Sequence, residues 1–161
     1  MQILVKQIRQ RFEKENAVFL FNKYQEELDV DITFQNFNEE INDPIKKYNK
    51  NYGGLFMAYC EGDLAGCVAL QNLGKNICEM KRLYVLPEYR RYGVGKVLVE
   101  ALLKYAAILG YKTMKLDTLE KLQPAIILYK KLGFVPTTPY YNNPLPNVVY
   151  LEKKLGLTFL H

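Results

Sequence analysis

Hydrophobic residues recur with a short period in the middle of the chain and with a longer, helical period on either side. Mostly apolar segments at 55–60, 64–70 and 77–85 predict three strands. The residues at 61–63 are typical of a hairpin turn, and Pro87 ends the third strand because proline cannot donate to a strand ladder. The pattern therefore predicts an antiparallel sheet in this part of the chain.

A period of three to four residues predicts helices elsewhere. It is clearest over 94–109, where apolar side chains recur on one helical face. Shorter helical patterns cover 8–28, 44–48 and 124–132, and Asp43 is a suitable N-cap for the second of these. We therefore expect about four helices.

Three more strands are predicted near 112–118, 134–140 and 148–154. The chain contains no repeat, no low-complexity segment and no linker. We therefore expect one domain over residues 1–161, of the α/β (α+β) class, with an antiparallel hairpin region first and βαβ units later.

The composition excludes several kinds of active site. The chain has no serine and no tryptophan, and its single histidine is the last residue, His161. A Ser-His-Asp triad, a conventional Cys-His pair and a zinc site built on several histidines are therefore excluded, and we expect no metal. Any chemistry must use Glu, Asp, Tyr, Lys, Cys or backbone amides.

The cysteines and the hydropathy indicate in which cellular compartment the protein is found. Cys60, Cys67 and Cys78 are odd in number, lie in mostly apolar surroundings and form no CxxC pair. They predict buried free thiols in a reducing compartment. No apolar run is long enough to span a membrane, and the first residues lack the apolar stretch of a signal peptide. We expect a cytoplasmic protein with no membrane partner.

The net charge of +5 is unevenly distributed. Between Tyr24 and Ile45 there is no Lys or Arg, but there are seven acidic residues: Glu26, Glu27, Asp29, Asp31, Glu39, Glu40 and Asp43. A basic body favours an anionic ligand, and an acidic segment favours a cationic one. Solvated helix faces would give the same pattern.

The segment most informative about function lies between the third predicted strand and the long helix. It reads Arg90-Arg91-Tyr92-Gly93-Val94-Gly95-Lys96, and we call it the glycine loop. Two glycines allow a tight turn and close approach of a ligand, and the helix start offers free N–H groups to phosphate oxygens. The loop matches neither GxxxxGK[ST] nor GxGxxG. On this pattern alone a structural turn is an equal alternative.

With two further segments, the glycine loop resembles the GNAT family of N-acetyltransferases. Residues 90–95 match that family's [QR]-x-x-G-x-[GA] loop, residues 79–85 resemble its fourth strand, and residues 128–134 resemble its LYxxxGF signature. The resemblance covers about half of the chain. It implies a mixed sheet of about six to seven strands, splayed between the fourth and fifth strands, with about four flanking helices.

The resemblance also implies a cosubstrate, acetyl-CoA, and the residues that bind it. Backbone N–H groups of the glycine loop would hold the pyrophosphate, with added charge from its basic side chains. The pantetheine arm would lie along the main chain of the fourth strand like an added strand. The implied binding residues are Leu83, Tyr84, Val85, Arg90, Arg91, Tyr92, Gly93, Val94, Gly95 and Lys96.

Two side chains are implied in catalysis. Glu79 stands where histone-acetylating members carry their catalytic glutamate and would act as the general base. Tyr129 matches the tyrosine that protonates the departing thiolate. The structural alternatives are a salt bridge from Glu79 to Lys81 or Arg82, and a core role for Tyr129. Acetyl transfer to an amine needs no covalent intermediate, so these residues and backbone amides would suffice.

One position departs from the family pattern. Leu122, followed by Gln123, replaces an asparagine that helps many members to hold the coenzyme. Asp117 and Thr118 end a predicted strand and are candidates to line the cleft. The loop at 140–146 reads either as a wall of the acceptor pocket or as a surface turn.

The leading hypothesis is an enzyme that acetylates a primary amine, either a small molecule or a lysine or N-terminal amine of a protein. The acidic segment favours a cationic acceptor. A non-catalytic acetyl-CoA sensor with the same fold is the alternative. Nucleic-acid binding is disfavoured because no aromatic residues interleave with the basic cluster of Lys81, Arg82, Arg90 and Arg91. A homodimer is possible.

Overall fold

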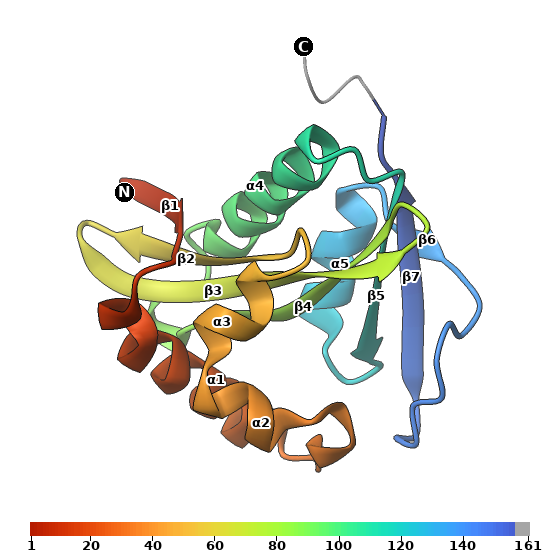
Figure 1. Ribbon diagram of the computed structural model, residues 1–161, viewed down its shortest axis with the longest axis horizontal. Coiled ribbons are helices and arrows are strands. Elements are labelled where there is room, and N and C mark those ends of the chain that lie inside the picture. The colour runs from red at the N-terminus through yellow and green to blue at the C-terminus, as the bar shows by residue number, and fades with distance from the viewer. Residues whose placement is uncertain (157–161) are drawn as a thin grey trace.

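A seven-stranded sheet forms the middle layer of the computed structural model, which describes residues 1–156 (Figure 1). The strand order is β1-β2-β3-β4-β5-β7-β6. The strands are β1 (Ile3–Gln7), β2 (Gly54–Cys60), β3 (Asp63–Gly74), β4 (Ile77–Val85), β5 (Thr113–Leu119), β6 (Val135–Pro136) and β7 (Val148–Lys154). The helices are α1 (Lys14–Leu28), α2 (Phe37–Asn42), α3 (Pro44–Asn49), α4 (Val94–Ile108) and α5 (Gln123–Lys131).

The sheet is mixed, as expected. Neighbouring strands from β1 to β4 are antiparallel, β4 and β5 are parallel, and β7 runs antiparallel to both β5 and β6. A parallel pair needs a crossover connection, and α4 supplies it between β4 and β5. This arrangement confirms the predicted α/β class with an antiparallel region first.

Alternating side chains of the strands build a separate apolar layer on each face of the sheet. In β2, Phe56 and Ala58 pack in the cluster that contains α4, whereas Leu55 and Met57 pack in the cluster that contains α1. Figure 1 shows α4 on one side of the sheet and α1, α2 and α3 on the other. Because both faces are covered, the central strands read as nearly continuous apolar runs.

A β-bulge in β4 reverses this alternation at Arg82. The register against β3 shifts between Cys67 and Ala69, and Arg82 adopts a φ of 59°, which is uncommon for a residue other than glycine. Before the bulge, Met80 packs in the α4 cluster, and after it Leu83 does so. Two consecutive side chains, Lys81 and Arg82, therefore point away from α4.

The N-terminal prediction is partly wrong. Residues 8–28 were expected to form one helix, but a 3₁₀ turn at Arg11–Glu13 comes first and α1 begins only at Lys14. The expected apolar stripe also fails, because Phe12 is 80% exposed. The edge strand β1 was not predicted, since only its pairing with β2 reveals that its alternating side chains cover the sheet.

Two other elements differ from the prediction. The strand expected at 134–140 is only Val135–Pro136, because Pro136 and Pro139 cannot donate to a ladder and the segment leaves the sheet edge. The short helix α2 was not predicted, so the structure has one α-helix more than expected. In α3, the side chain of Asp43 accepts a hydrogen bond from the N–H of Lys46, which confirms the predicted N-cap.

The predicted free thiols are confirmed, because Cys60, Cys67 and Cys78 are all buried and unpaired. Within residues 1–156, no helix has both the length and the apolar character needed to cross a membrane. In the same residues, no three His, Cys, Asp or Glu side chains gather where they could hold a metal ion.

Candidate active site

A cleft opens in the sheet where β4 and β5 separate. The two strands pair only from Ile77 to Glu79 on β4 and from Thr113 to Lys115 on β5. Beyond these pairs the edge of β4 that faces β5 has no strand partner. A cavity of about 80 Å³ fills this gap, and Leu83, Thr118 and Tyr129 are among its lining residues. We call it the strand cleft.

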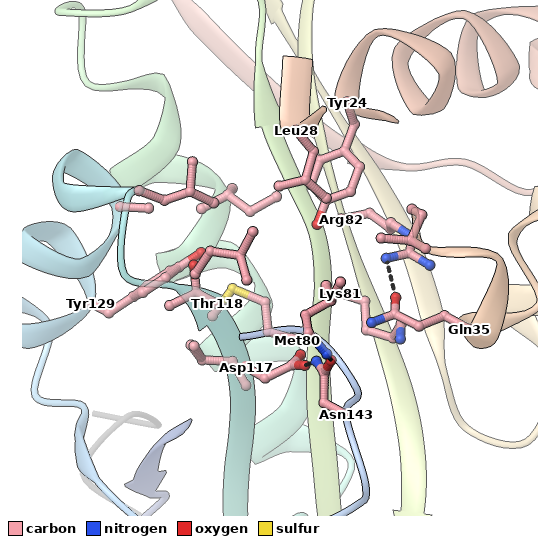
Figure 2. Close-up of a pocket in the computed structure, with 17 residues that line it drawn as sticks. Tyr24, Leu28, Gln35, Met80, Lys81, Arg82, Asp117, Thr118, Tyr129 and Asn143 are labelled. Carbon is pink, nitrogen blue, oxygen red and sulfur yellow. Dashed lines mark hydrogen bonds between the residues drawn. The ribbon is translucent and has the colours of Figure 1, made fainter. Parts of the chain in front are cut away.

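Tyr129 reaches the strand cleft from α5. Figure 2 shows it on the opposite side of the pocket from Arg82. Its ring packs edge-on against Phe134, with the ring centroids 5.9 Å apart, and the residue is 6% exposed. Within residues 1–156 its hydroxyl has no hydrogen-bond partner, and burial raises the pKa of this phenol. Tyr129 is therefore both a core aromatic and a protonated hydroxyl available to the cleft.

Glu79 lies in a second, larger space. This cavity of about 670 Å³, the large cavity, is bounded by β4, the segment before α2 and the loop that precedes β7. The Tyr140 hydroxyl donates a 2.6 Å hydrogen bond to Oε2 of Glu79, and Lys81 Nζ lies 3.9 Å from Oε1. Burial raises the pKa of Glu79, and both neighbours offset this in part. A carboxyl with a raised pKa suits a general base near neutral pH.

The two predicted catalytic residues therefore do not line the same cavity. Glu79 lines the large cavity and Tyr129 lines the strand cleft. Lys81 and Gln35 line both, so the two spaces adjoin at these side chains. The alternative of a Glu79 salt bridge holds only for Lys81, and at a distance beyond a hydrogen bond.

Arg82 is held by the helical layer instead. Its Nε and Nη2 donate to the Glu40 carboxylate at 2.7 and 3.1 Å, and its Nη1 donates to Gln35 at 2.8 Å. The guanidinium also stacks over the rings of Tyr24 and Phe37. Arg82 is 4% exposed and Glu40 is fully buried, so this ion pair fixes the bulge of β4 against α2.

The glycine loop presents the N-terminus of α4. Gly93 is the N-cap with a φ of 82°, and no side chain caps the N–H groups of the first turn. A Cβ added at Gly95 would meet only Leu128 at 3.4 Å and Val85 at 3.9 Å, which are ordinary contacts. The fold itself therefore does not need glycine at position 95. Free N–H groups beside a bare backbone fit a phosphate ligand.

Arg90 was expected to offer its charge to the coenzyme, but its side chain is already paired within the protein. Its guanidinium forms two 2.7 Å hydrogen bonds with Glu27 of α1, and its Nε donates to the carbonyl of Val85 at 2.8 Å. The Tyr84 hydroxyl also donates to Glu27, at 2.8 Å. These contacts occupy the Arg90 side chain and the Val85 carbonyl, whereas the side chains of Arg91, Tyr92 and Lys96 are exposed and that of Val94 is in the core.

Residues 5–134 match the model of the acetyltransferase (GNAT) family. The chain belongs to the GNAT family. An uncharacterized N-acetyltransferase of Schizosaccharomyces pombe is 45% identical over 139 residues, which cover 85% of each chain. This protein is accordingly an N-acetyltransferase, an acyltransferase that depends on acetyl-CoA.

Solved structures confirm the GNAT fold. A GNAT acetyltransferase from Staphylococcus aureus superposes with a TM-score of 0.80 at 20% identity, covering 96% of this chain and all of that one. The spermidine N-acetyltransferase of Vibrio cholerae, in complex with CoA and spermine, gives a TM-score of 0.73 at 19% identity and covers 99% of both chains.

The loop before β7 adds polar residues to this GNAT site, and the hydrogen bonds that they form were not predicted from the sequence. Asp117, a predicted lining residue, accepts hydrogen bonds from the Tyr141 hydroxyl and, at 2.8 Å, from Asn143. Asp117, Thr118 and Leu122 all line the strand cleft. The loop at 140–146 is therefore a wall of the site, and its paired tyrosines and asparagines were the available signal.

The structure bears on two inferences that were drawn from charge. Lys81 and Arg82 are almost buried, so they add nothing to a basic surface for nucleic acid, a partner that the sequence already disfavoured. Within the acidic segment, Glu40 is buried against Arg82, and Glu27 pairs with Arg90 of the glycine loop. The segment is therefore partly structural, because its charges neutralise neighbouring arginines.

Proposed function

We propose that this acetyltransferase moves an acetyl group directly from acetyl-CoA to a primary amine, with Glu79 as the general base and Tyr129 as the general acid. The observation that carries the proposal is the position of Glu79. It is a carboxylate, 3% exposed, that lines the large cavity and lies on the strand whose free edge borders the strand cleft. An amine bound in the large cavity would lie beside Glu79, its proton acceptor, and next to the adjoining strand cleft.

Several features support the coenzyme assignment. When bound, acetyl-CoA supplies the acetyl group in an activated thioester. The uncapped first turn of α4 and the bare backbone at Gly95 would hold its phosphates, and the unpaired edge of β4 at Leu83 would hold its pantetheine arm. The Vibrio cholerae relative, which binds CoA with the same fold, supports this assignment.

Glu79 would remove the proton that the amine must lose on attack. Its hydrogen bond from Tyr140 fixes one carboxylate oxygen and leaves the other directed to Lys81. Because burial raises the pKa of Glu79, the carboxylate is a stronger base than an exposed one. Tyr129 stays protonated at neutral pH, because burial raises its pKa, and would donate to the departing thiolate.

The test is an amine panel with acetyl-CoA, followed by release of free thiol. Glu79→Gln should lower kcat by about 100-fold or more at neutral pH and leave coenzyme affinity unchanged. The loss should shrink at high pH, where free amine is abundant. Glu100→Gln, on the exposed face of α4, is the matched control. A loss that is independent of pH would assign Glu79 a structural role and contradict the proposal.

A further inference from the structure

The ammonium group of Lys81 is nearly buried and has no hydrogen-bond partner. The Lys81 side chain is 10% exposed, and the nearest carboxylate oxygen, Oε1 of Glu79, lies 3.9 Å away. Across residues 1–156 no acceptor lies within hydrogen-bond distance of its nitrogen. Within the described residues, none of its three donors is used in a hydrogen bond. Because Lys81 lines two cavities, a ligand in either one would reach these donors.

The position of Lys81 restricts what that ligand is. Lys81 lines both the large cavity and the strand cleft, and its neighbour on the same face of β4 is Glu79, the proposed base. A group bound by Lys81 would therefore lie beside the reacting amine. The bulge at Arg82 contributes to this placement, because Arg82 binds the helical layer and Lys81 is the cationic side chain that lines both cavities beside Glu79.

The charges around the large cavity favour an anion. Three lysines line it, namely Lys47, Lys81 and Lys115, against the single carboxylate of Glu79. The carboxylates that pair with Lys47 and Lys115 are each shared with a second cation. Glu40 also binds Arg82, and Glu152 also lies 3.5 Å from Lys154. The wall therefore keeps a surplus of positive charge.

We propose that Lys81 binds the carboxylate of the acceptor, so that the acceptor class is an α-amino acid or a similar amine with an adjacent carboxylate. This inference rests on the proposed function. The acceptor's nitrogen would meet Glu79 and its carboxylate would meet Lys81, with opposite charges facing each other. The 3.9 Å between the two side chains suits a ligand whose own amine and carboxylate are adjacent. The structure thus favours an acceptor opposite in character to the cationic one expected from the acidic segment.

The experiment compares matched acceptors that differ only at the carboxyl group. Alanine and alaninamide, and phenylalanine and phenylalaninamide, are assayed with acetyl-CoA, with kcat/KM corrected for the fraction of free amine. The wild type should prefer each amino acid over its amide by at least about tenfold, as expected for hydrogen bonds to a charged group. Lys81→Met should abolish this preference, and Lys104→Met, on the exposed face of α4, should retain it.

The possible failures are distinguishable. Equal rates for acid and amide in the wild type, or a preference for the amide, would overturn the inference and leave the proposed function standing. A Lys81→Met enzyme that loses activity equally on both acceptors would also overturn it, because Lys81 would then act on the reaction itself. No thiol release with any amine would overturn the proposed function and this inference together. The wild-type ratio can overturn the inference without any variant, and Lys81→Met then separates Lys81 from Lys47 and Lys115, which line the same cavity.

Discussion

The hydroxyl of Tyr140 donates a 2.6 Å hydrogen bond to Oε2 of Glu79, joining the loop before β7 to strand β4 across 61 positions of the sequence. The Tyr140 ring is itself held by Lys115, whose Nζ lies 5.6 Å from the ring centroid. A hydrogen bond to a carboxylate stabilises its charged form. Tyr140 is therefore a positioning residue that also limits how far burial raises the pKa of Glu79.

Removing the Tyr140 hydroxyl should move the pH profile of the enzyme. In Tyr140→Phe the pKa of Glu79 rises further, because a contact that favours the ionised carboxylate is lost. Since a base works when deprotonated, the rising limb of kcat/KM against pH should shift upward by about one pH unit. Tyr52→Phe, an exposed tyrosine, is the control. If the rising part of the profile does not move, ionisation of Glu79 does not determine the pH dependence of kcat/KM.

Gly95→Ala should weaken acetyl-CoA binding by at least about tenfold without loss of stability. The new methyl group would make only ordinary contacts inside the protein, with Leu128 at 3.4 Å. It would, however, occupy the surface where phosphate approaches the first turn of α4. Calorimetry measures the affinity, and the melting temperature reports the fold. If this variant and Gly95→Val both keep the wild-type affinity for acetyl-CoA and the wild-type stability, the glycine loop does not bind the phosphates.

Tyr129→Phe should slow turnover by about 100-fold and spare both stability and coenzyme affinity. The phenol makes no hydrogen bond within residues 1–156, so its loss leaves no protein group without a partner. The ring contact with Phe134 is retained. Steady-state kinetics with the best amine of the panel measures the effect. Full activity in this variant would show that Tyr129 contributes to packing and not to catalysis.

Glu40→Ala should destabilise the protein by about 3–5 kcal/mol, because it leaves the buried Arg82 guanidinium without its counter-charge. Glu39→Ala, exposed on the same helix, should change the free energy of unfolding by no more than about 0.5 kcal/mol. Urea unfolding at constant pH measures both. Equal small effects would show that the ion pair does not hold the bulge.

The same pair should make stability fall in acid. Burial opposes ionisation of Glu40, but Arg82, Tyr48 and Lys47 together outweigh it and hold the pKa of Glu40 below its ordinary value. A carboxyl with a depressed folded-state pKa contributes stability above its unfolded-state pKa and loses it as the pH falls through the folded-state value. Between neutral and acidic pH, the free energy of unfolding should therefore fall less in Glu40→Gln than in the wild type. Urea unfolding at a series of pH values measures this difference.

The elements with strong local signals were predictable from the sequence. The long helix α4 and the strands β4 and β7 lie where their sequence patterns placed them. Both α4 and β4 bury several apolar side chains, and β7 pairs with β5 over its whole length. The glycine loop was recognisable because Gly93 takes a positive φ at the turn before α4 and Gly95 leaves the backbone bare two residues later. Elements with weak local signals, such as β1 and α2, were missed because tertiary packing alone stabilises them.

What the sequence by itself determined is the family, the chemical groups available and the position of Glu79 on its strand. Only the tertiary structure decided which groups meet. Strict alternation along β4 would have placed Arg82 on the same face as Met80, and the bulge reversed this. Hydrogen bonds such as Tyr140 to Glu79, and the isolation of Lys81, depend on segments distant in sequence. No local pattern encodes such contacts, because they form only when the loop before β7 and the helices close over the sheet.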